Sequence, residues 1–401
     1  MGETSLKPGW KMVKFGEVVK NANLVERGPE ANGIERIVGL EHIDPENLHV
    51  RRWNSVADGT SFTRRFVPGQ TLFGKRRAYQ RKVAYAEFEG ICSGDILTFE
   101  PKNRKVLLPE LLPFICQSDA FFDHALGTSA GSLSPRTSWK ALQDFEFALP
   151  PIDKQRQIAK ALWLADKALD SLHKSIVSID KLVLALISDT LHNAMTAGAC
   201  AFPLNELAAK TPHAIVDGPF GSNLKASHYR DAGIPVIQSG FVTSGKFVPG
   251  SYSFVTEEHF LSQIRSRAIP GDIVMAKKGE NCGRCAVVPP NHPESLVASN
   301  ALKISVNTDI CMPEFVQAVF HLHYERNRMC DLKNHTAQPN ISLPLLKKQL
   351  VTVPSLEVQR ALVEQLALCR DAQSALMQHS QHLTMLIGFG TELFGESRLV
   401  V

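Results

Sequence analysis

The sequence predicts an α+β fold in which two domains of mixed α/β structure alternate with two long helices. Three observations lead to this prediction. A repeat of about 200 residues runs through the 401-residue chain, each half opens with short β-like runs, and each half closes with an apolar heptad pattern. We expect the two helices to pair as an antiparallel coiled coil, which makes the chain a pseudo-two-fold repeat.

The internal repeat is clearest in the last quarter of each half, where one constant offset applies. There, Pro135, Ser138, Pro150, Gln155 and Arg156 recur as Pro339, Ser342, Pro354, Gln359 and Arg360. Earlier in each half the offset drifts by a few residues, as loops of different length would cause. Residues 33–39 match residues 233–239, and residues 67–70 match residues 269–272.

The opening part of each half contains short apolar runs between glycines and prolines, which is typical of strands. Such runs lie at 82–86, 95–99, 272–275 and 301–305. Helical patterns follow at 109–123 and 313–330. These features delimit two domains, 1–150 and 198–354.

Long helices are predicted at 151–197 and 355–394, each introduced by a proline. Their apolar residues alternate spacings of three and four, and burial of each contributes ~1.5–3 kcal/mol, so the two stripes are expected to pack together. The expected interface residues are Ile158, Leu162, Leu169, Leu172, Ile176, Ile179, Val183, Leu362, Leu366, Leu376 and Leu383. The polar Gln373 and Ser380 interrupt the second stripe. The alternative is core packing within separate domains, but the stretch from Asp153 to Met195 alone would be about 64 Å long as a helix, more than one domain spans.

The composition is that of an ordinary globular protein, with 44% hydrophobic and 21% charged residues. The sequence contains no apolar run long enough for a membrane span and no secretory signal, so we expect a cytoplasmic protein that does not bind membranes. The eight cysteines are scattered, which favours reduced thiols.

Positive charge is concentrated in one segment, although the net charge of the chain is only +4. Residues 51–83 contain nine Lys and Arg residues against the single acidic residue Asp58. A phosphate-binding surface needs such a local excess. The alternative interpretation is a solvated charged face.

Several motifs resemble those of the specificity subunits of Type I restriction–modification systems. Residues 149–159 (LPPIDKQRQIA) are similar to the start of the helical region in that family, and residues 353–360 repeat the pattern more loosely. Residues 217–225 (DGPFGSNLK) resemble the start of many of its target-recognition domains, and the first half lacks this segment. The resemblance covers essentially the whole chain.

The resemblance implies two target-recognition domains, each of which reads one half of a bipartite site in double-stranded DNA. It also implies that the helices set the spacer and dock two modification subunits, which methylate adenine, and that restriction/translocase subunits join this core. No cofactor is expected in this chain, whereas S-adenosylmethionine, ATP and Mg²⁺ are expected on the partner subunits.

Candidate DNA-binding residues come from the basic segment, from its counterpart in the second half, and from a polar loop in each half that offers hydrogen-bond donors and acceptors. They are Lys75, Arg76, Arg77, Arg81, Lys82, Ser134, Arg136, Lys277, Lys278, Arg284, Asn334, Gln338 and Asn340.

Catalytic motifs are weak, and we expect a non-catalytic chain. Residues 127–131 fit the Gly-x-Ser-x-Gly pattern, but a helical pattern precedes them where a nucleophile elbow needs a strand. Cys282 and Cys285 have the spacing of half a zinc site without a second pair. Phosphate-loop and amino-methyltransferase motifs are absent from the sequence. Two alternatives stay open: a DNA-reading module of another multi-subunit modification or phage-defence system, and an enzyme with an unrecognised site.

Overall fold

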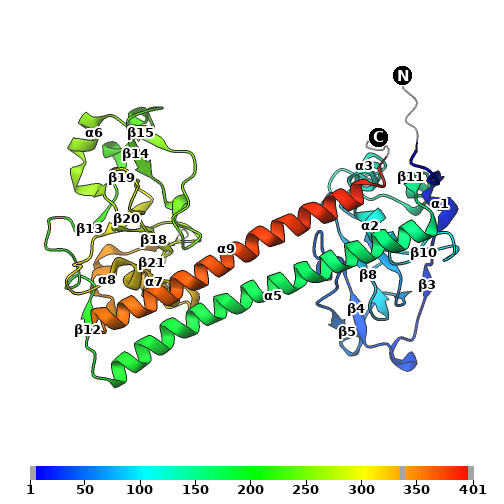
Figure 1. Ribbon diagram of the computed structural model, residues 1–401, viewed down its shortest axis with the longest axis horizontal. Helices are drawn as coiled ribbons and strands as arrows, with labels where there is room; N and C mark the ends of the chain where they lie inside the picture. The colour runs from blue at the N-terminus through cyan, green and yellow to red at the C-terminus, as the bar shows by residue number, and fades with distance from the viewer. Residues whose placement is uncertain (1–5, 335–338, 396–401) are drawn as a thin grey trace. The chain divides into compact units, whose positions relative to one another are not determined.

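The computed structural model describes residues 6–334 and 339–395. The chain divides into two compact units, unit 1 with residues 1–174 and 376–401, and unit 2 with residues 175–375. Two long helices, α5 (Ile152–Thr196) and α9 (Leu356–Glu392), each contribute one part to each unit (Figure 1). The predicted α+β fold with two long helices is confirmed.

Unit 1 contains two main sheets beside a two-stranded one. The pair β1 (Lys11–Lys14) and β11 (Glu146–Leu149) is antiparallel. The four-stranded antiparallel sheet has the order β2 (Val19–Asn21), β10 (Ile96–Pro101), β7 (Thr71–Gly74), β8 (Val83–Tyr85). The five-stranded sheet has the order β3 (Leu24–Val25), β6 (Arg64–Phe66), β9 (Gly90–Cys92), β4 (Arg36–Val38), β5 (Asn54–Ser55).

Short helices complete unit 1 around an aromatic core. These helices are α1 (Phe15–Val18), α2 (Leu112–Gln117), α3 (Asp119–Gly127) and α4 (Trp139–Leu142). The fully buried Phe15 ring lies 5.3 Å from that of Phe99 and 5.0 Å from that of Phe121. Leu162 of α5 and Ile387 of α9 pack against the same cluster, so the long helices are part of the core of unit 1.

Unit 2 repeats this strand plan. The pair β12 (Ala201–Pro203) and β23 (Leu350–Thr352) corresponds to β1 and β11. Its first four-stranded sheet has the order β13 (Ile215–Asp217), β20 (Ala301–Ile304), β17 (Ile273–Ala276), β18 (Cys285–Val287). Its second has the order β15 (Ser253–Val255), β14 (Ile234–Ile237), β19 (Ser295–Val297), β16 (Arg267–Ala268), and β21 (Lys333–Asn334) pairs with β22 (Asn340–Ile341). The helices are α6 (Glu257–Ser262), α7 (Pro313–Glu325) and α8 (Leu343–Lys348).

The second main sheet of each unit contains one parallel pair among antiparallel ones. In unit 1, β4 runs parallel to β9, with Ile37 opposite Ile91. In unit 2, β14 runs parallel to β19, with Val236 opposite Leu296. The same exception at the same place in both units supports the duplication read from the sequence.

The two long helices run antiparallel within unit 1. Leu162 of α5 lies so close to Gly390 of α9 that a Cβ on this glycine would stand 2.5 Å from the leucine Cδ2. Further along α5, His173 Nε2 lies 3.3 Å from Ser380 Oγ, an earlier residue of α9. In unit 2, the Gln373 amide of α9 donates a hydrogen bond of 2.6 Å to Asp180 Oδ1 of α5. The polar residues in the second apolar stripe therefore bind side chains of the partner helix.

A buried glutamine joins each long helix to the domain that precedes it. The Gln155 amide donates to the carbonyls of Val106 (2.7 Å) and Pro150 (2.9 Å) and accepts from Leu108 N (3.0 Å). In unit 2, Gln359 makes the same three bonds to Ile310 (3.1 Å), Pro354 (2.8 Å) and Met312 (2.9 Å). The proline and the glutamine that recur at each helix start are thus explained by a clamp that satisfies backbone groups at the domain boundary.

Among the helices in the described ranges 6–334 and 339–395, none is both long and apolar enough to span a bilayer.

Candidate nucleic-acid interface

The first candidate site is a short hairpin, residues 130–136, that lies beside the segment 75–77 of unit 1. The hairpin closes with Ala130 N donating to Arg136 O (3.0 Å) and Arg136 N donating to Ala130 O (2.9 Å). It docks through two further bonds, from Arg77 N to Pro135 O (2.7 Å) and from Thr137 N to Lys75 O (3.0 Å). The structure thereby brings together residues that the sequence singled out for separate reasons, a basic segment and a polar loop.

One carboxylate orients the arginines of this first hairpin site. The Arg136 guanidinium donates to both carboxylate oxygens of Asp95 (3.0 and 3.3 Å), and Arg76 Nη1 lies 3.7 Å from the same group. Arg76 Nη2 also donates to Ser134 Oγ at 3.1 Å. Burial opposes ionisation of Asp95, but the Arg136 hydrogen bond and the neighbouring cations lower its pKa overall. Asp95, which the sequence did not single out as a site residue, therefore stays charged and holds two arginines in place.

The remaining charges at this site leave an excess of positive charge. Burial lowers the pKa of Lys75, with a further contribution from the Arg64 charge. Arg77 has a left-handed backbone, with φ at 53°. A single acid beside several cations favours binding of a phosphate backbone over binding of a cation.

Unit 2 contains the same arrangement of a hairpin docked on a basic segment, called the hairpin frame below, with different side chains. The hairpin is closed by β21 and β22, where Asn334 pairs with Asn340, and Asn340 forms a bridge with Lys278. Docking again uses two bonds, from Gly279 N to Pro339 O (3.0 Å) and from Ile341 N to Lys277 O (2.9 Å). Asn340 thus stands where Arg136 stands in unit 1. The expected Gln338 lies outside the described residues.

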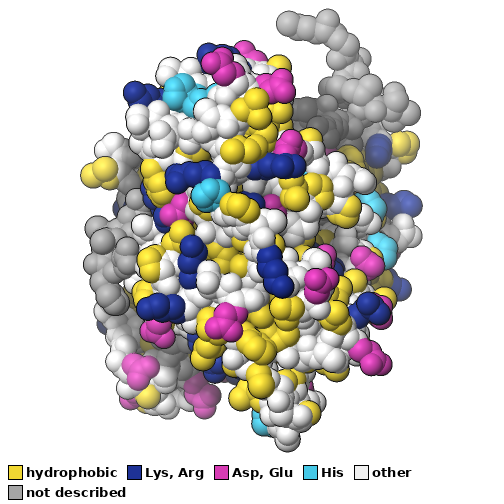
Figure 2. All heavy atoms as spheres, turned by 90° about the vertical axis from the view of Figure 1, so that its left-hand side faces the viewer, with side chains coloured by type: hydrophobic (Ala, Val, Ile, Leu, Met, Phe, Trp, Pro, Cys, Tyr) yellow, Lys and Arg dark blue, Asp and Glu magenta, His cyan; other side chains and the backbone are white. Residues whose placement is uncertain are grey.

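Not every basic candidate of unit 2 is free for DNA. Lys277 is only 6% exposed, and its ammonium is 2.7 Å from Asp217 and 4.4 Å from the Phe220 ring centroid. Arg284 pairs with Glu325 at 3.0 Å and lies over the Tyr324 ring. Figure 2, in which unit 2 faces the viewer, shows Lys and Arg side chains interspersed with acidic and apolar ones. Positive charge therefore does not form one continuous patch on this visible face of unit 2.

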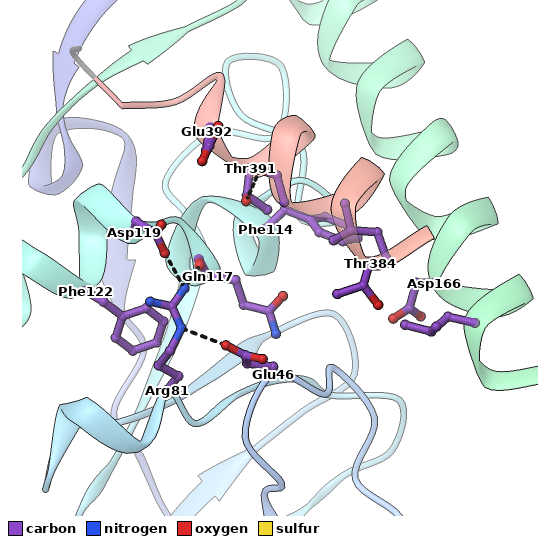
Figure 3. Close-up of a pocket in the computed structure, with 13 residues that line it drawn as sticks. Glu46, Arg81, Phe114, Gln117, Asp119, Phe122, Asp166, Thr384, Thr391 and Glu392 are labelled. Atoms are coloured by element: carbon purple, nitrogen blue, oxygen red, sulfur yellow. Dashed lines mark hydrogen bonds and ion pairs between the residues drawn. The ribbon is translucent and has the colours of Figure 1, made fainter. Parts of the chain in front are cut away.

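Arg81 and Lys82 of unit 1 are also engaged elsewhere. Figure 3 shows Arg81 in a pocket between α3 and the end of α9, where it pairs with Asp119 (2.8 Å) and Glu46 (3.3 Å). Lys82 Nζ donates to the Leu40 carbonyl at 2.5 Å. Both side chains hold unit 1 together in this conformation, and the structure does not bring them to the hairpin.

Part of the basic excess in 51–83 serves the attachment of the domain to α5. Arg51 pairs with Asp170 at 2.6 Å. His49 beside it bridges Asp166 (2.8 Å) and Glu87 (3.0 Å). The hydrogen bond to Asp166 is the largest influence on His49 and raises its pKa. The charge count of the sequence thus overstates the number of cations that face solvent.

The residues expected at the helix interface differ in burial. Leu162, Leu362 and Leu366 are buried in the two cores. Partly buried are Ile158, Leu169, Leu172, Ile176, Ile179, Val183, Leu376 and Leu383. The three buried residues each belong to the hydrophobic core of a unit.

The residues of the weak catalytic motifs make hydrogen bonds to the backbone or lie in a hydrophobic core. Ser129 Oγ donates to the Ala125 carbonyl at 2.8 Å, and α3 precedes it instead of a strand. Cys282 and Cys285 lie in the core of unit 2, and burial raises the pKa of the Cys285 thiol to about 12. Within the described residues, no three His, Cys, Asp or Glu side chains are grouped to hold a metal ion.

Comparison with known proteins relates the whole chain to one family. Residues 9–180 and 221–381 match the model of the Type I restriction modification DNA specificity domain. The specificity subunit of the EcoDI enzyme from Escherichia coli is 23% identical over 48% of this chain, and that of the MjaVIII enzyme from Methanocaldococcus jannaschii is 21% identical over 69%. The matched stretches span 44% and 67% of the lengths of these two relatives.

Solved structures share the fold at low identity. The Type I restriction–modification S subunit from M. genitalium has a TM-score of 0.57 and 14% identity, with 96% of each chain covered. A chain from a study of assembly and conformational transition of the type I R-M system has a TM-score of 0.53 and 18% identity, with 98% of this chain and 99% of that one covered. Since the family model covers well over half of the sequence, in both halves, the chain belongs to the Type I restriction modification DNA specificity domain family.

Proposed function

We propose that the chain is the sequence-specific DNA-recognition subunit of a Type I restriction–modification complex. In this proposal each unit reads one half of a bipartite site in double-stranded DNA. The observation that supports it best is the hairpin frame, which recurs in both units with a basic residue on the docking segment, Arg76 in one and Lys278 in the other. Two frames with different side chains suit two half-sites of different sequence.

The side chains of each frame divide into positioning and reading roles. Lys75, Arg76 and Arg77 are suited to phosphate contacts, which fix the register but carry no sequence information. Arg136 and Asn340 occupy equivalent positions, and each side chain can make bidentate contacts to a base, arginine to guanine and asparagine to adenine. The affinity contributed by the first group should depend on salt, and the specificity contributed by the second should not.

The long helices are proposed to dock two modification subunits. Leu164 and Leu368 are 59% and 70% exposed, and Leu182 and Leu386 are 49% and 51% exposed. Each pair is separated by the same offset as Gln155 and Gln359, so each unit presents one exposed leucine from each helix. Two equivalent apolar surfaces fit two copies of one partner. S-adenosylmethionine would then belong to these partners, and ATP and Mg²⁺ to restriction subunits.

The helices are further proposed to set the spacer between the half-sites. Helix α5 has 45 residues and is about 68 Å long, twice the ~34 Å of one turn of B-DNA. Four residues inserted after Leu186 would add about 6 Å and about one helical turn. The gap should then lengthen by one or two base pairs, and an unaltered gap would assign the spacing to the modification subunits.

Exchange of one domain tests the proposal. Residues 1–150 are replaced by the equivalent domain of a relative, and methylated sites are mapped across the genome of the host strain. One half-site should change while the other stays. A change in both half-sites, or in neither, would contradict independent reading by the two units. As a control for the absence of catalysis, the purified chain alone should transfer no methyl group from S-adenosylmethionine to DNA.

A further inference from the structure

The tip of the first hairpin carries an apolar side chain that no described contact accounts for. Leu133 is 90% exposed, more than any other large hydrophobic side chain in the described part of the chain. Single exposed leucines are ordinary on protein surfaces, so exposure alone indicates little. The position of Leu133 makes it informative, because Ser132 and Ser134 flank it and the cations Arg76 and Arg136 lie at the base of the same hairpin.

The backbone of the hairpin holds Leu133 away from the body of unit 1. The bonds between Ala130 and Arg136 close a loop of five residues, and Gly131 begins the turn with φ at 107°, a conformation that other residues rarely adopt. The bonds of residues 135 and 137 to the segment 75–77 fix the base. The tip is thus presented on a braced support.

We propose that the hairpin 130–136 enters the major groove and that Leu133 contacts the C5 methyl group of one thymine in the first half-site. This inference rests on the proposed function and names a specificity residue within it. Leu133 lies three positions before Arg136, so the two Cα atoms are at most about 10 Å apart. The major groove is about 8.5 Å deep, so a hairpin whose base holds Arg76 at phosphate level can place its tip at the floor of the groove.

The width of the hairpin and the chemistry of Leu133 both favour the major groove over the minor groove. Two hairpin strands lie about 4.8 Å apart before side chains are added, which suits the ~12 Å major groove and not the ~6 Å minor groove. The thymine methyl is the apolar feature of the major-groove floor. Leucine offers no hydrogen bond, so it can favour thymine over cytosine only through this methyl group.

Uracil substitution tests the contact, because uracil keeps the hydrogen bonds of thymine and lacks only the methyl group. Duplexes with the mapped site carry uracil in place of each thymine of the first half-site, one at a time. Dissociation constants are measured by fluorescence anisotropy with the assembled methyltransferase at one salt concentration. At one position, uracil should weaken binding by the wild type about fourfold, the equivalent of ~0.8 kcal/mol for one buried methyl group.

Variants of Leu133 complete the test. Leu133→Ala and Leu133→Ser should bind the thymine and uracil duplexes equally, whereas Leu133→Met should keep the difference. No uracil penalty in the wild type, the same penalty in Leu133→Ala, or a first half-site without any thymine would each overturn the inference. A duplex with the first half-site scrambled separates the two proposals: if the wild type binds it unchanged, the proposed function itself fails.

Discussion

Replacement of Gln155 by alanine should destabilise unit 1 strongly, because this side chain joins helix α5 to the domain that precedes it. Gln155 is 1% exposed and satisfies the carbonyls of Val106 and Pro150 and the amide of Leu108. Alanine leaves these three backbone groups without their partner at the start of α5. Each unpaired buried group costs about 1–3 kcal/mol, and partial access of water to the space left reduces the sum to about 3 kcal/mol.

Tryptophan fluorescence makes this loss measurable in unit 1 alone. The four tryptophans of the chain, Trp10, Trp53, Trp139 and Trp163, all belong to unit 1. Trp163 itself donates to the Glu110 carbonyl at 2.8 Å, close to the clamp in sequence. For a unit of about 200 residues, 3 kcal/mol corresponds to a decrease in Tm of about 6–12 °C.

Two control variants show whether the clamp is the cause. Gln157→Ala removes an exposed glutamine two residues away and should leave Tm within about 1 °C. Gln359→Ala removes the equivalent clamp of unit 2 and should change the tryptophan transition little if the units unfold separately. A Tm for Gln155→Ala equal to that of Gln157→Ala would refute the view that these three bonds hold the domain on its helix.

Two further predictions concern charges in unit 1. The Asp166 hydrogen bond raises the pKa of His49 above 6.5, so the stability that protonated His49 contributes is fully present below about pH 6.5 and is lost as pH rises through the folded-state pKa. The Tm measured by tryptophan fluorescence should therefore fall between pH 6 and pH 8.5 more in the wild type than in His49→Gln. Parallel pH profiles of the two proteins would contradict this. Combined alanine substitution of Lys75, Arg76 and Arg77 should weaken DNA binding by the assembled complex and reduce the slope of log K against log salt by up to about three units. The matched triple Lys154, Arg156 and Lys160 to alanine, on the exposed start of α5, should leave the slope unchanged, and equal slopes for both triples would show that the hairpin surface does not contact phosphate.

The repeat and the long helices could be predicted from the sequence because their signals are periodic and local. The shorter elements have weaker signals in the sequence, and the structure differs from the prediction there. The helical pattern at 109–123 is two helices, since Ser118 has an extended backbone and its Oγ caps α3 by accepting from Phe121 N (3.2 Å). The match of 33–39 with 233–239 is shifted by one residue, because the parallel pairs place Val38 opposite Cys92 and Ile237 opposite Val297.

Only the basic segment of the candidate site could be predicted from the sequence, because its signal is also local. Charge counting identified Lys75, Arg76 and Arg77, but it could not show which cations have partners within the fold. Lys277 meets Asp217, which lies 60 residues earlier in the chain, and Arg81 meets Asp119. Sequence neighbours reveal local charge excess, whereas ion pairing between distant segments depends on the folded sheet order.

The two hairpin frames indicate how one fold can present different specificities. The bonds that dock each hairpin, from Arg77 N to Pro135 O and from Gly279 N to Pro339 O, involve only backbone atoms. Side chains at the bridge positions can therefore differ, as Arg136 and Asn340 do, without loss of the frame. Under the proposed function, a change of base preference then requires substitution of a few side chains at a fixed place on the DNA. Stability is maintained elsewhere, by the glutamine clamps and the helix cores, so recognition can diverge between the units while the shared fold is kept.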